Sequence, residues 1–354
     1  MRLLFVNSIA NSTWGGGEKW MVTAASGLKR RGHQVWIGCR SDSILGERAW
    51  DAGLNVLLLP IAGDLNPLLV AKLTRFLKKE KIQILIPNLI KDIRTAGLAG
   101  RLSKTPLILA RQGLVLCKKR WKYKIGFQYL TDGIIVNSQG IADTYQSYGW
   151  FKDNQIHLIH NGIDLPIETN EGTANDRPVI FSAGRLDPQK NFPMLLKTAL
   201  LAKTEQKPWE FVIAGEGPEK HSLENMIENL KLTNVKLIGF QEKLKPWLEK
   251  CDLFALPSRF EGMPNVVMEA MAFAKPVVAT NLPGTQELMI HGTTGLLVEK
   301  DDGSAFFDAI KQILESKDAG RIMGQAGRKK IEIFFSVETM LDNLEDLFHR
   351  LGAA

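Results

Sequence analysis

The chain has 354 residues, of which 45% are hydrophobic and 23% charged, so it holds enough apolar material for two cores and is not a disordered protein. Its three cysteines stand far apart, which argues against a structural zinc site, and no apolar run approaches the roughly 20 residues of a membrane-spanning helix. A cytoplasmic protein is expected, with its N-terminus a first strand and not a signal peptide.

The net charge of +7 is unevenly distributed. Residues 1–165 contain 23 Lys and Arg against 11 Asp and Glu, a balance of +12, which leaves 22 against 27, or −5, for residues 166–354. The first part is therefore predicted to face an anionic partner.

Short β-branched runs alternate with helix-like segments in the first part of the chain. Helices are predicted at 17–31, 66–80 and 138–148, and strands at 2–7, 34–39, 54–60, 82–87, 106–110, 133–137 and 156–159. Such alternation predicts a parallel sheet with right-handed crossovers. Residues 1–165 are therefore predicted to form a Rossmann-like domain.

A stretch rich in Asn, Gly, Thr, Glu and Pro without periodicity, residues 161–178, is the predicted linker. The same plan then returns, with strands predicted at 179–184, 209–215, 234–239, 252–257, 276–280 and 295–298, and three helical stretches close the chain, the last near 336–350. A second Rossmann-like domain is thus predicted over 166–335. Ligands bind beyond the carboxyl ends of parallel strands, so two such domains face to face would enclose a cleft.

The first candidate motif is WGGGEKW, residues 14–20, between the first strand and the first helix. Its three glycines allow a ligand to approach the backbone closely. It lacks the G-x-G-x-x-G fingerprint and an acidic ribose anchor, which argues against a NAD-dependent oxidoreductase. A glycine loop with a purely structural role is the alternative.

A basic and aromatic segment, CKKRWKYKIGF at 117–127, follows later in the first domain. Such a segment can lie on an anionic membrane, where each nearby cation contributes ~1 kcal/mol. A solvated helix face is the alternative interpretation. The chain contains no recognisable nucleic-acid-binding module, so no nucleic-acid partner is expected.

In the second domain, GRLDPQKN at 184–191 follows a predicted strand. Arg185 and Lys190 bracket its turn, and two cations there can neutralise a diphosphate and stabilise a leaving group as negative charge develops. A plain turn with solvated charges is the alternative. A similar turn, AGEGPE at 214–219, follows the next strand and is expected to be mainly structural.

The stretch SRFEGMPNVVMEAMA, residues 258–272, is predicted to be a loop that runs into a helix with Pro264 at its first position. The N–H groups of residues 265–267 would then be free to bind an anion such as phosphate. Glu269 lies about one turn further, where its carboxylate can accept two hydrogen bonds from a ribose diol. Glu261 would hold a second sugar. An ordinary salt-bridged helix residue is the alternative for Glu269.

Together, GGGE at 15–18, NGID at 161–164, GRLDPQKN at 184–191 and the pair Glu261 and Glu269 resemble the retaining glycosyltransferases of family four, which have the GT-B fold. The resemblance covers nearly the whole chain. It implies that the second domain binds a nucleotide-sugar, with a UDP-sugar as the expected donor, and that the first binds the acceptor. It also implies retained anomeric configuration, no cofactor and no essential metal, and a last helix, about 336–354, that packs back on the first domain.

The resemblance assigns roles to particular residues. The catalytic candidates are Arg185, Lys190 and Glu261. The donor-binding candidates are Gly16, Gly17, Gly184, Gly215, Phe240, which would hold the base, Gly262, Met263, Pro264, Asn265, Val266, Val267 and Glu269. The acceptor candidates are Glu18, Lys91, Asp92, Arg94, Arg111 and Gln112, with helix capping as the alternative for the charges at 91–94.

One departure concerns Gln112. Similar proteins usually place a histidine near the transferred sugar at this turn, and a glutamine can donate a hydrogen bond but cannot carry a proton.

The expected acceptor is a hydroxyl of a glycan or lipid-linked molecule in lipopolysaccharide or other cell-envelope polysaccharide synthesis, reached in the cytoplasm or at the inner face of the cytoplasmic membrane. A nucleotide-sugar epimerase of the same fold is the alternative, but it needs an acid/base pair beside the sugar carbon, and none can be assigned. A non-catalytic sugar-nucleotide-binding protein is the remaining alternative.

Overall fold

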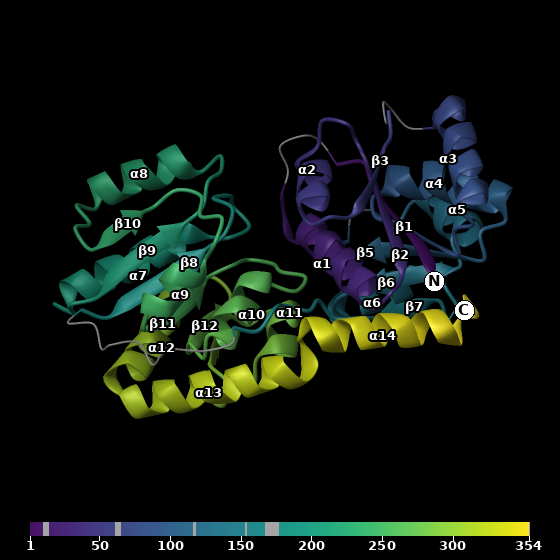
Figure 1. Ribbon diagram of the computed structural model, residues 1–354. Helices are drawn as coiled ribbons and strands as arrows, with labels where there is room; N and C mark the ends of the chain where they lie inside the picture. The colour runs from purple at the N-terminus through teal and green to yellow at the C-terminus, as the bar shows by residue number, and fades with distance from the viewer. Residues whose placement is uncertain (10–13, 61–64, 116–117, 153, 167–176, 354) are drawn as a thin grey trace. The chain divides into compact units, whose positions relative to one another are not determined.

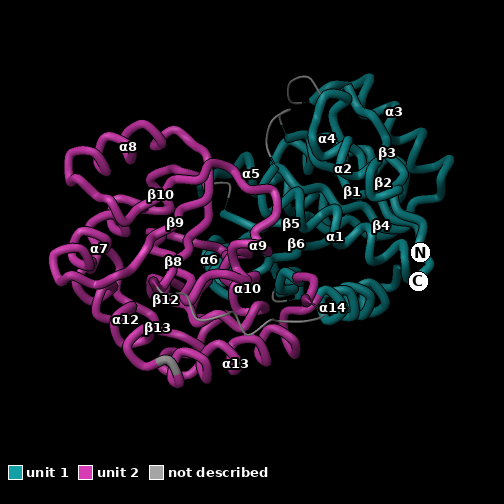
Figure 2. Tube along the Cα trace, turned by 60° about the vertical axis from the view of Figure 1, so that its left-hand side comes forward, with its two compact units in different colours: residues 1–162, 337–354 teal, residues 163–336 magenta. Residues whose placement is uncertain are grey.

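The computed structural model describes residues 1–9, 14–60, 65–115, 118–152, 154–166 and 177–353, and it divides the chain into two compact units (Figure 1). Unit 1 contains Met1–Gly162 and Val337–Ala354, and unit 2 contains Ile163–Ser336 (Figure 2). Both units are parallel sheets flanked by helices, which confirms the predicted α/β class. Most of the predicted linker, residues 167–176, lies outside the described residues.

Unit 1 has a seven-stranded sheet in the order β3-β2-β1-β4-β5-β6-β7. Its strands are β1 (Arg2–Asn7), β2 (Gln34–Cys39), β3 (Asn55–Leu58), β4 (Ile84–Pro87), β5 (Leu107–Gln112), β6 (Gly133–Val136) and β7 (Ile156–Leu158). All seven predicted strands are confirmed. The strand order reverses between β1 and β4, so the loops after these two strands flank a topological switch point, where open α/β sheets bind ligands.

The helices of unit 1 cover both faces of its sheet. They are α1 (Gly16–Arg30), α2 (Ile44–Asp51), α3 (Pro67–Lys79), α4 (Ile90–Ser103), α5 (Trp121–Leu130), α6 (Gln139–Ser147) and α14 (Val337–Arg350). Side chains of a strand alternate between its faces. Leu3 and Phe5 accordingly pack in a core with α1, α2 and α14, while Leu4 and Val6 pack on the other face with α3 and α4.

The last helix returns to unit 1 and packs beside α1. Arg31, directly after α1, forms ion pairs with three carboxylates of α14: Glu338, Asp342 at 2.7 Å and Glu345 at 2.6 Å. Leu341 and Leu344 bury their side chains in the same core as α1. The first 162 residues and the last helix therefore form one folded unit.

Unit 2 has a six-stranded sheet in the order β10-β9-β8-β11-β12-β13. Its strands are β8 (Val179–Ala183), β9 (Glu210–Ala214), β10 (Val235–Leu237), β11 (Leu253–Leu256), β12 (Val277–Thr280) and β13 (Leu296–Val298). Its helices are α7 (Phe192–Thr204), α8 (Lys220–Asn229), α9 (Lys245–Lys250), α10 (Asn265–Ala272), α11 (Pro283–Leu288), α12 (Gly303–Glu315) and α13 (Lys317–Phe334). Here the order reverses between β8 and β11, and the two motifs at 184–191 and 258–272 directly follow these strands.

Candidate functional site

The turn after β8 and the loop after β11 meet through a close ion pair. Lys190 Nζ donates to Glu261 Oε1 at 2.6 Å. The two side chains are only 15% and 7% exposed. This ion pair is largely shielded from water. It holds the Lys190 ammonium and the Glu261 carboxylate side by side in the switch region, and each group fixes the orientation of the other.

Ser258 binds the same carboxylate oxygen. Its side chain is 1% exposed, and its Oγ donates to Glu261 Oε1 at 2.6 Å. Oε1 therefore accepts one hydrogen bond from a cation and one from a hydroxyl, while no group among the described residues donates to Oε2. Ser258 was not among the predicted site residues, although its place three residues before Glu261 at a strand end was an available signal.

Further hydrogen bonds join the two segments along their length. Arg259 N donates to the Gln189 carbonyl at 2.7 Å, and Gln189 Nε2 donates to the Phe260 carbonyl at 3.0 Å. Asp301 Oδ1 accepts from Arg259 Nε at 3.1 Å and from Asn191 Nδ2 at 3.0 Å. The loops after β8, β11 and β13 therefore support one another and fix the position of the Lys190–Glu261 pair.

Two of the predicted glycines, Gly184 and Gly215, and a third that was not predicted, Gly284, are closely approached by neighbouring atoms. A Cβ on Gly184 would lie 3.1 Å from Lys190 Cε, and a Cβ on Gly215, whose φ is +152°, would lie 1.9 Å from the Gly184 carbonyl oxygen. A Cβ on Gly284 would meet the Gly262 carbonyl oxygen at 2.0 Å. Glycine at these positions lets the loops that carry Lys190 and Glu261 pack against their neighbours without side chains between them.

Two other predicted residues point into solvent. Arg185 is 71% exposed, and its one ion pair within the described part of the chain is with Asp187 at 3.8 Å. Phe240, shortly after β10, is 61% exposed. The structure does not bring Arg185 into contact with the Lys190–Glu261 pair, so the cation remains available to an incoming anion.

The N-terminus of α10 differs in detail from its prediction. Pro264 is the N-cap, with φ −76° and ψ 101°, and α10 begins at Asn265, one residue later than expected. The prediction of a free N–H at Val267 is wrong, because this N–H donates to the Pro264 carbonyl at 3.0 Å, which tightens the first turn. The helix dipole still gives this end of α10 a partial positive charge.

Glu269 lies on α10 and is half-buried. The neighbouring Val267, Met268, Ala270 and Met271 are buried in the core of unit 2, so Glu269 occupies the side of the helix that the core leaves uncovered. Met263 is 7% exposed and belongs to the same core, so its side chain packs inside the unit. Gly262 and Val266 were also predicted to bind the donor. Gly262 lies in the loop just before α10, and Val266 is the second residue of the helix.

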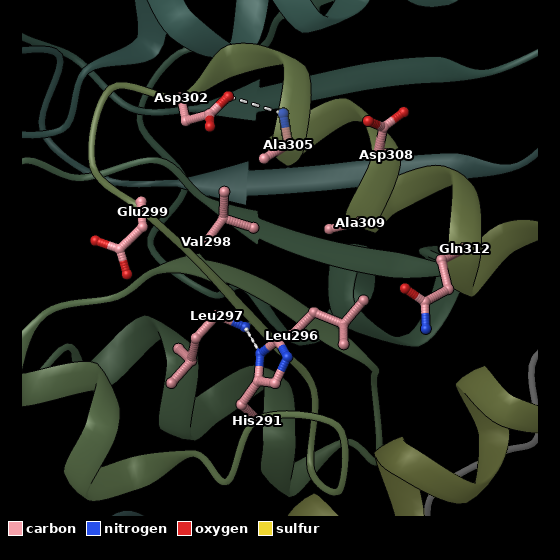
Figure 3. A pocket seen from close by; sticks show the side chains of 10 residues that line it. All are labelled: His291, Leu296, Leu297, Val298, Glu299, Asp302, Ala305, Asp308, Ala309 and Gln312. Atoms are coloured by element: carbon pink, nitrogen blue, oxygen red, sulfur yellow. Dashed lines mark hydrogen bonds between the residues drawn. The ribbon is translucent and has the colours of Figure 1, made fainter.

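A separate hollow of about 340 Å³ lies between β13 and α12 (Figure 3). Its walls include Glu299, Asp302, Asp308 and His291. Two of these groups are engaged by backbone amides: Asp302 accepts from Ala305 N at 2.9 Å, and His291 Nδ1 accepts from Leu297 N at 3.0 Å. None of the predicted site residues lines this hollow.

At the switch point of unit 1, two predicted acceptor residues cap helices. Glu18 accepts from Asn7 Nδ2 at 2.9 Å and from Gly15 N at 3.0 Å, and Asp92 Oδ2 accepts from Ser8 N at 3.1 Å and from Leu89 N at 3.0 Å. Burial raises the pKa of Asp92 to about 6, and these hydrogen bonds oppose the rise. The helix-capping alternative therefore describes Asp92.

Arg111 is buried, at 4% exposure, beside the glycine loop. Its guanidinium lies 4.3 Å from the ring centroid of Trp20, and its Nη2 donates to Asn161 Oδ1 at 3.2 Å. A Cβ on Gly17 would lie 3.8 Å from Arg111 Nη1, so the arginine and the predicted ligand loop are neighbours. Burial lowers the pKa of Arg111 to about 10, while the charge of Glu18 opposes this shift.

Gln112 is fully buried, and protein groups use its amide. Nε2 donates to the carbonyls of Asn88 at 3.0 Å and Arg111 at 2.8 Å, and Oε1 accepts from Tyr145 Oη at 2.8 Å. A direct acceptor contact by Gln112 does not fit this arrangement. The residue instead holds the ends of β4 and β5 and helix α6 together.

Lys91 and Arg94 are half-buried on the first turns of α4, and their contact with an acceptor stays a prediction.

Sequence reasoning missed a row of buried amides at this edge. Asn7 ends β1, Asn88 follows β4, Asn137 follows β6 and Asn161 lies beyond β7, each no more than 6% exposed. The signal was present, because RLLFVN, ILIPN and GIIVN are apolar strands that end in an amide. These amides order the strand ends next to Arg111 and the glycine loop.

Two negative findings concern the described residues alone. Within them, no group of three His, Cys, Asp or Glu side chains is placed to hold a metal ion. Their helices are also too short or too polar for any of them to cross a membrane.

Two family models match the chain, and they meet near its middle. Residues 14–166 match the model described as "Glycosyltransferase Family 4", and residues 166–330 match the model "Glycosyl transferases group 1". The second range contains Arg185, Lys190, Glu261 and Glu269. Together the two models extend over both units.

Two curated relatives are similar to this chain over a little under two thirds of its length. The lipopolysaccharide core biosynthesis glycosyltransferase LpsE of Rhizobium meliloti is 28% identical over 60% of this chain and 62% of its own length. The N-acetylgalactosamine-N,N'-diacetylbacillosaminyl-diphospho-undecaprenol 4-alpha-N-acetylgalactosaminyltransferase of Campylobacter jejuni is 32% identical over 64% of this chain and 63% of its own length. The chain thus matches a little under two thirds of each of these relatives.

Solved structures share the fold over the whole chain. The Anabaena protein Alr3699/HepE in complex with UDP and glucose has a TM-score of 0.84 at 21% identity, with 99% of both chains covered. The lipopolysaccharide outer core galactosyltransferase WaaB in its apo form has a TM-score of 0.77 at 20% identity, again with 99% of both chains covered. These likenesses confirm the predicted GT-B fold.

Proposed function

The chain belongs to the glycosyl transferases group 1, and on that premise we propose that it transfers a sugar from a nucleotide-sugar, with a UDP-sugar as donor, to a hydroxyl of a glycan or glycolipid acceptor. We further propose that the reaction retains the anomeric configuration and serves lipopolysaccharide or other cell-envelope polysaccharide synthesis. The relatives named above, which act in lipopolysaccharide core synthesis and on a diphospho-undecaprenol acceptor, support this choice.

The observation that carries the proposal is the Lys190–Glu261 pair with Ser258 at the switch point of unit 2. The ammonium of Lys190 is the cation that would hold the donor diphosphate and stabilise the charge that develops on it as the sugar leaves. Glu261 keeps one oxygen on Lys190 and Ser258 and presents Oε2 to a hydroxyl of the transferred sugar. One carboxylate would thus orient both the cation and the sugar.

The surrounding groups complete a donor site. Arg185, which is exposed, would turn toward the diphosphate and add a second positive charge, so the reaction would need no metal ion. The positive end of α10 would favour the phosphates, Glu269 would bind the ribose diol, and Phe240 would stack on the base.

Unit 1 would bind the acceptor. Its balance of +12 favours a phosphorylated or lipid-linked molecule, and Arg111 beside Gly17 is a buried cation next to the ligand loop. The described part of the basic segment, residues 118–127, would contact an anionic membrane, and the reaction would then take place at the inner face of the cytoplasmic membrane. Trp121 and Tyr129, at 76% and 69% exposure, present aromatic rings there.

Calorimetric titration of the purified protein with UDP, GDP, ADP and NAD, in buffer that contains EDTA, tests the donor part. Binding of one nucleoside diphosphate is expected, with UDP the strongest, and binding of none of them would overturn the proposal. NMR of the product formed from an α-linked UDP-sugar should then show an α-linkage. Conversion of a nucleotide-sugar without any acceptor would instead support the epimerase alternative.

A further inference from the structure

An apolar groove of about 760 Å³ lies on the face of unit 1 where α3 packs beside α4. Its floor and walls come from Leu65, Val70, Ala71, Leu98 and Leu102. Leu65 and Leu102 are 53% and 54% exposed, so the groove is apolar and open.

The one hydroxyl in the groove does not make it polar. Thr74 Oγ1 donates to the Val70 carbonyl at 2.8 Å, so the donor is already used and the methyl group is the part left to a ligand. Leu68, one turn before Ala71 on the same helix, is 82% exposed and extends the apolar surface beyond the groove. A hydrocarbon chain fits such a lining better than any polar ligand does.

Cations form the remaining wall. Arg75 and Lys78 line the groove, and among the described residues neither has a carboxylate partner. The whole of α3 carries four basic residues, Lys72, Arg75, Lys78 and Lys79, and no acidic one.

The neighbouring helices continue this charge pattern. The one carboxylate of α4 belongs to Asp92, which is buried and accepts a hydrogen bond from the Leu89 backbone N–H. Helix α5 has no carboxylate, and both helices contain lysines or arginines. Helix α5 packs against α4 (Figure 1). Two of its apolar residues, Trp121 and Ile125, are 76% and 46% exposed. Exposed apolar side chains beside cations such as Arg75 and Lys78 are complementary to lipid, whose tails are apolar and whose head groups carry phosphate.

We propose that the α3–α4 groove binds one hydrocarbon chain of an anionic membrane lipid, with Arg75 and Lys78 on its phosphate. The face of α3, α4 and α5 then lies on the bilayer. This groove is separate from the Lys190–Glu261 pair, whereas residues 121–127 of the basic segment belong to α5 and so to the same face. The groove is tested by lipid binding and not by turnover, so the result does not depend on whether the proposed transferase activity is correct.

Co-sedimentation of the full chain with vesicles tests the site. The vesicles are pure phosphatidylcholine or phosphatidylcholine with 30% phosphatidylglycerol, at low salt. The wild-type protein is expected to bind the anionic vesicles and leave the neutral ones. Equal, weak binding to both, or binding of a short-chain lipid phosphate without binding of vesicles, would overturn the proposal.

Two double variants examine the two parts of the groove. Arg75→Glu with Lys78→Glu should weaken binding to anionic vesicles at least ~20-fold, since each cation near such a surface contributes about fivefold. Leu65→Ser with Leu102→Ser should weaken it ~10-fold through lost apolar contact. If the serine variant bound as tightly as the wild type, adsorption would be electrostatic only and the groove would have no role.

Matched controls come from other exposed positions. Lys197→Glu with Lys243→Glu makes the same change of net charge in unit 2, and Trp50→Ser removes an exposed apolar side chain from α2, on the opposite face of the unit 1 sheet. Both should bind anionic vesicles like the wild type, and a loss equal to that of the groove variants would contradict the site. Thermal unfolding of every variant excludes misfolding, and all should turn over a water-soluble acceptor normally.

Discussion

The carboxyl edges of the two sheets place charged side chains at equivalent points and use them differently. In unit 1, Glu18 and Asp92 are at most 4% exposed, and backbone N–H groups donate to both carboxylates. In unit 2, Lys190 and Glu261 bind each other and Arg185 is 71% exposed. A charge that binds the backbone is part of the scaffold, whereas a charge that binds another side chain can exchange that partner for a ligand.

The largest loss is expected for Lys190→Ala, which should lower turnover by about 10²–10³-fold because the leaving diphosphate loses a preorganised cation. It should also destabilise unit 2 by roughly 3 kcal/mol, since Glu261 is left 7% exposed without its partner. Steady-state kinetics and urea unfolding measure the two effects.

Adding Glu261→Gln to Lys190→Ala separates these effects. The double variant should regain most of the lost stability, because no uncompensated charge remains, yet it should stay inactive. Normal turnover in Lys190→Ala would show that the pair is only structural.

Arg185→Ala should lower turnover by ~10²-fold and leave the melting temperature unchanged, because the side chain is exposed and its one ion pair among the described residues, with Asp187, is long. The matched control is Lys236→Ala, which removes another exposed ion-paired cation of unit 2 and should be silent in both assays. Equal effects of the two substitutions would mean that Arg185 contributes only general charge.

Glu269→Ala should weaken UDP binding by about 1–3 kcal/mol, the range for hydrogen-bonding groups left unpaired. Calorimetry with UDP and with its 2'-deoxy analogue identifies the group concerned. The deoxy analogue should bind the variant and the wild type with more similar affinity, because part of the diol is missing. An equal loss for both nucleotides would place Glu269 away from the ribose.

Ser258→Ala should lower turnover by about tenfold, the effect of one hydrogen bond to a charged group, while UDP binding changes little. The reason is that Ser258 donates to Glu261 Oε1 and, in the proposed site, would orient this carboxylate without contacting the nucleotide. Ser182→Ala is the matched control, since that buried serine donates to the Ala255 carbonyl at 2.6 Å in the same sheet. A similar loss of turnover in both variants would indicate a structural effect.

Much of the fold could be predicted, because buried parallel strands are continuous apolar runs with clear ends, as RLLFVN and GIIVN show. The positions of the two loops of the proposed donor site could also be predicted, since each motif directly follows a strand. The burial of Gln112 could not, because it depends on Tyr145, 33 residues away. The α3–α4 groove was equally hidden, because it exists only once α3 and α4 are packed beside each other.

Asp92→Asn should have the smallest effect on turnover, within twofold, and it tests whether unit 1 charges are scaffold. The pKa of Asp92 is about 6 when folded against an ordinary value of 3.8, so the folded state binds the proton more tightly. Burial of the Asp92 carboxyl group therefore does not lower the free energy of unfolding below pH 4, where the group is protonated. The loss of stability grows as the pH rises to 6 and is complete above pH 6, where it reaches roughly 3 kcal/mol for two pKa units. Asparagine keeps an oxygen for Ser8 N and Leu89 N without the charge.

Urea unfolding at pH 4.5 and 7.5 checks this expectation. The wild type should lose stability between these two pH values through Asp92, and the variant should lose less and be the more stable protein at pH 7.5. A fall in turnover of tenfold or more with stability intact would make Asp92 an acceptor contact. Charged residues at both sheet edges would then bind substrates. A hydrogen bond from a charged side chain to the backbone would no longer indicate that the residue has only a structural role.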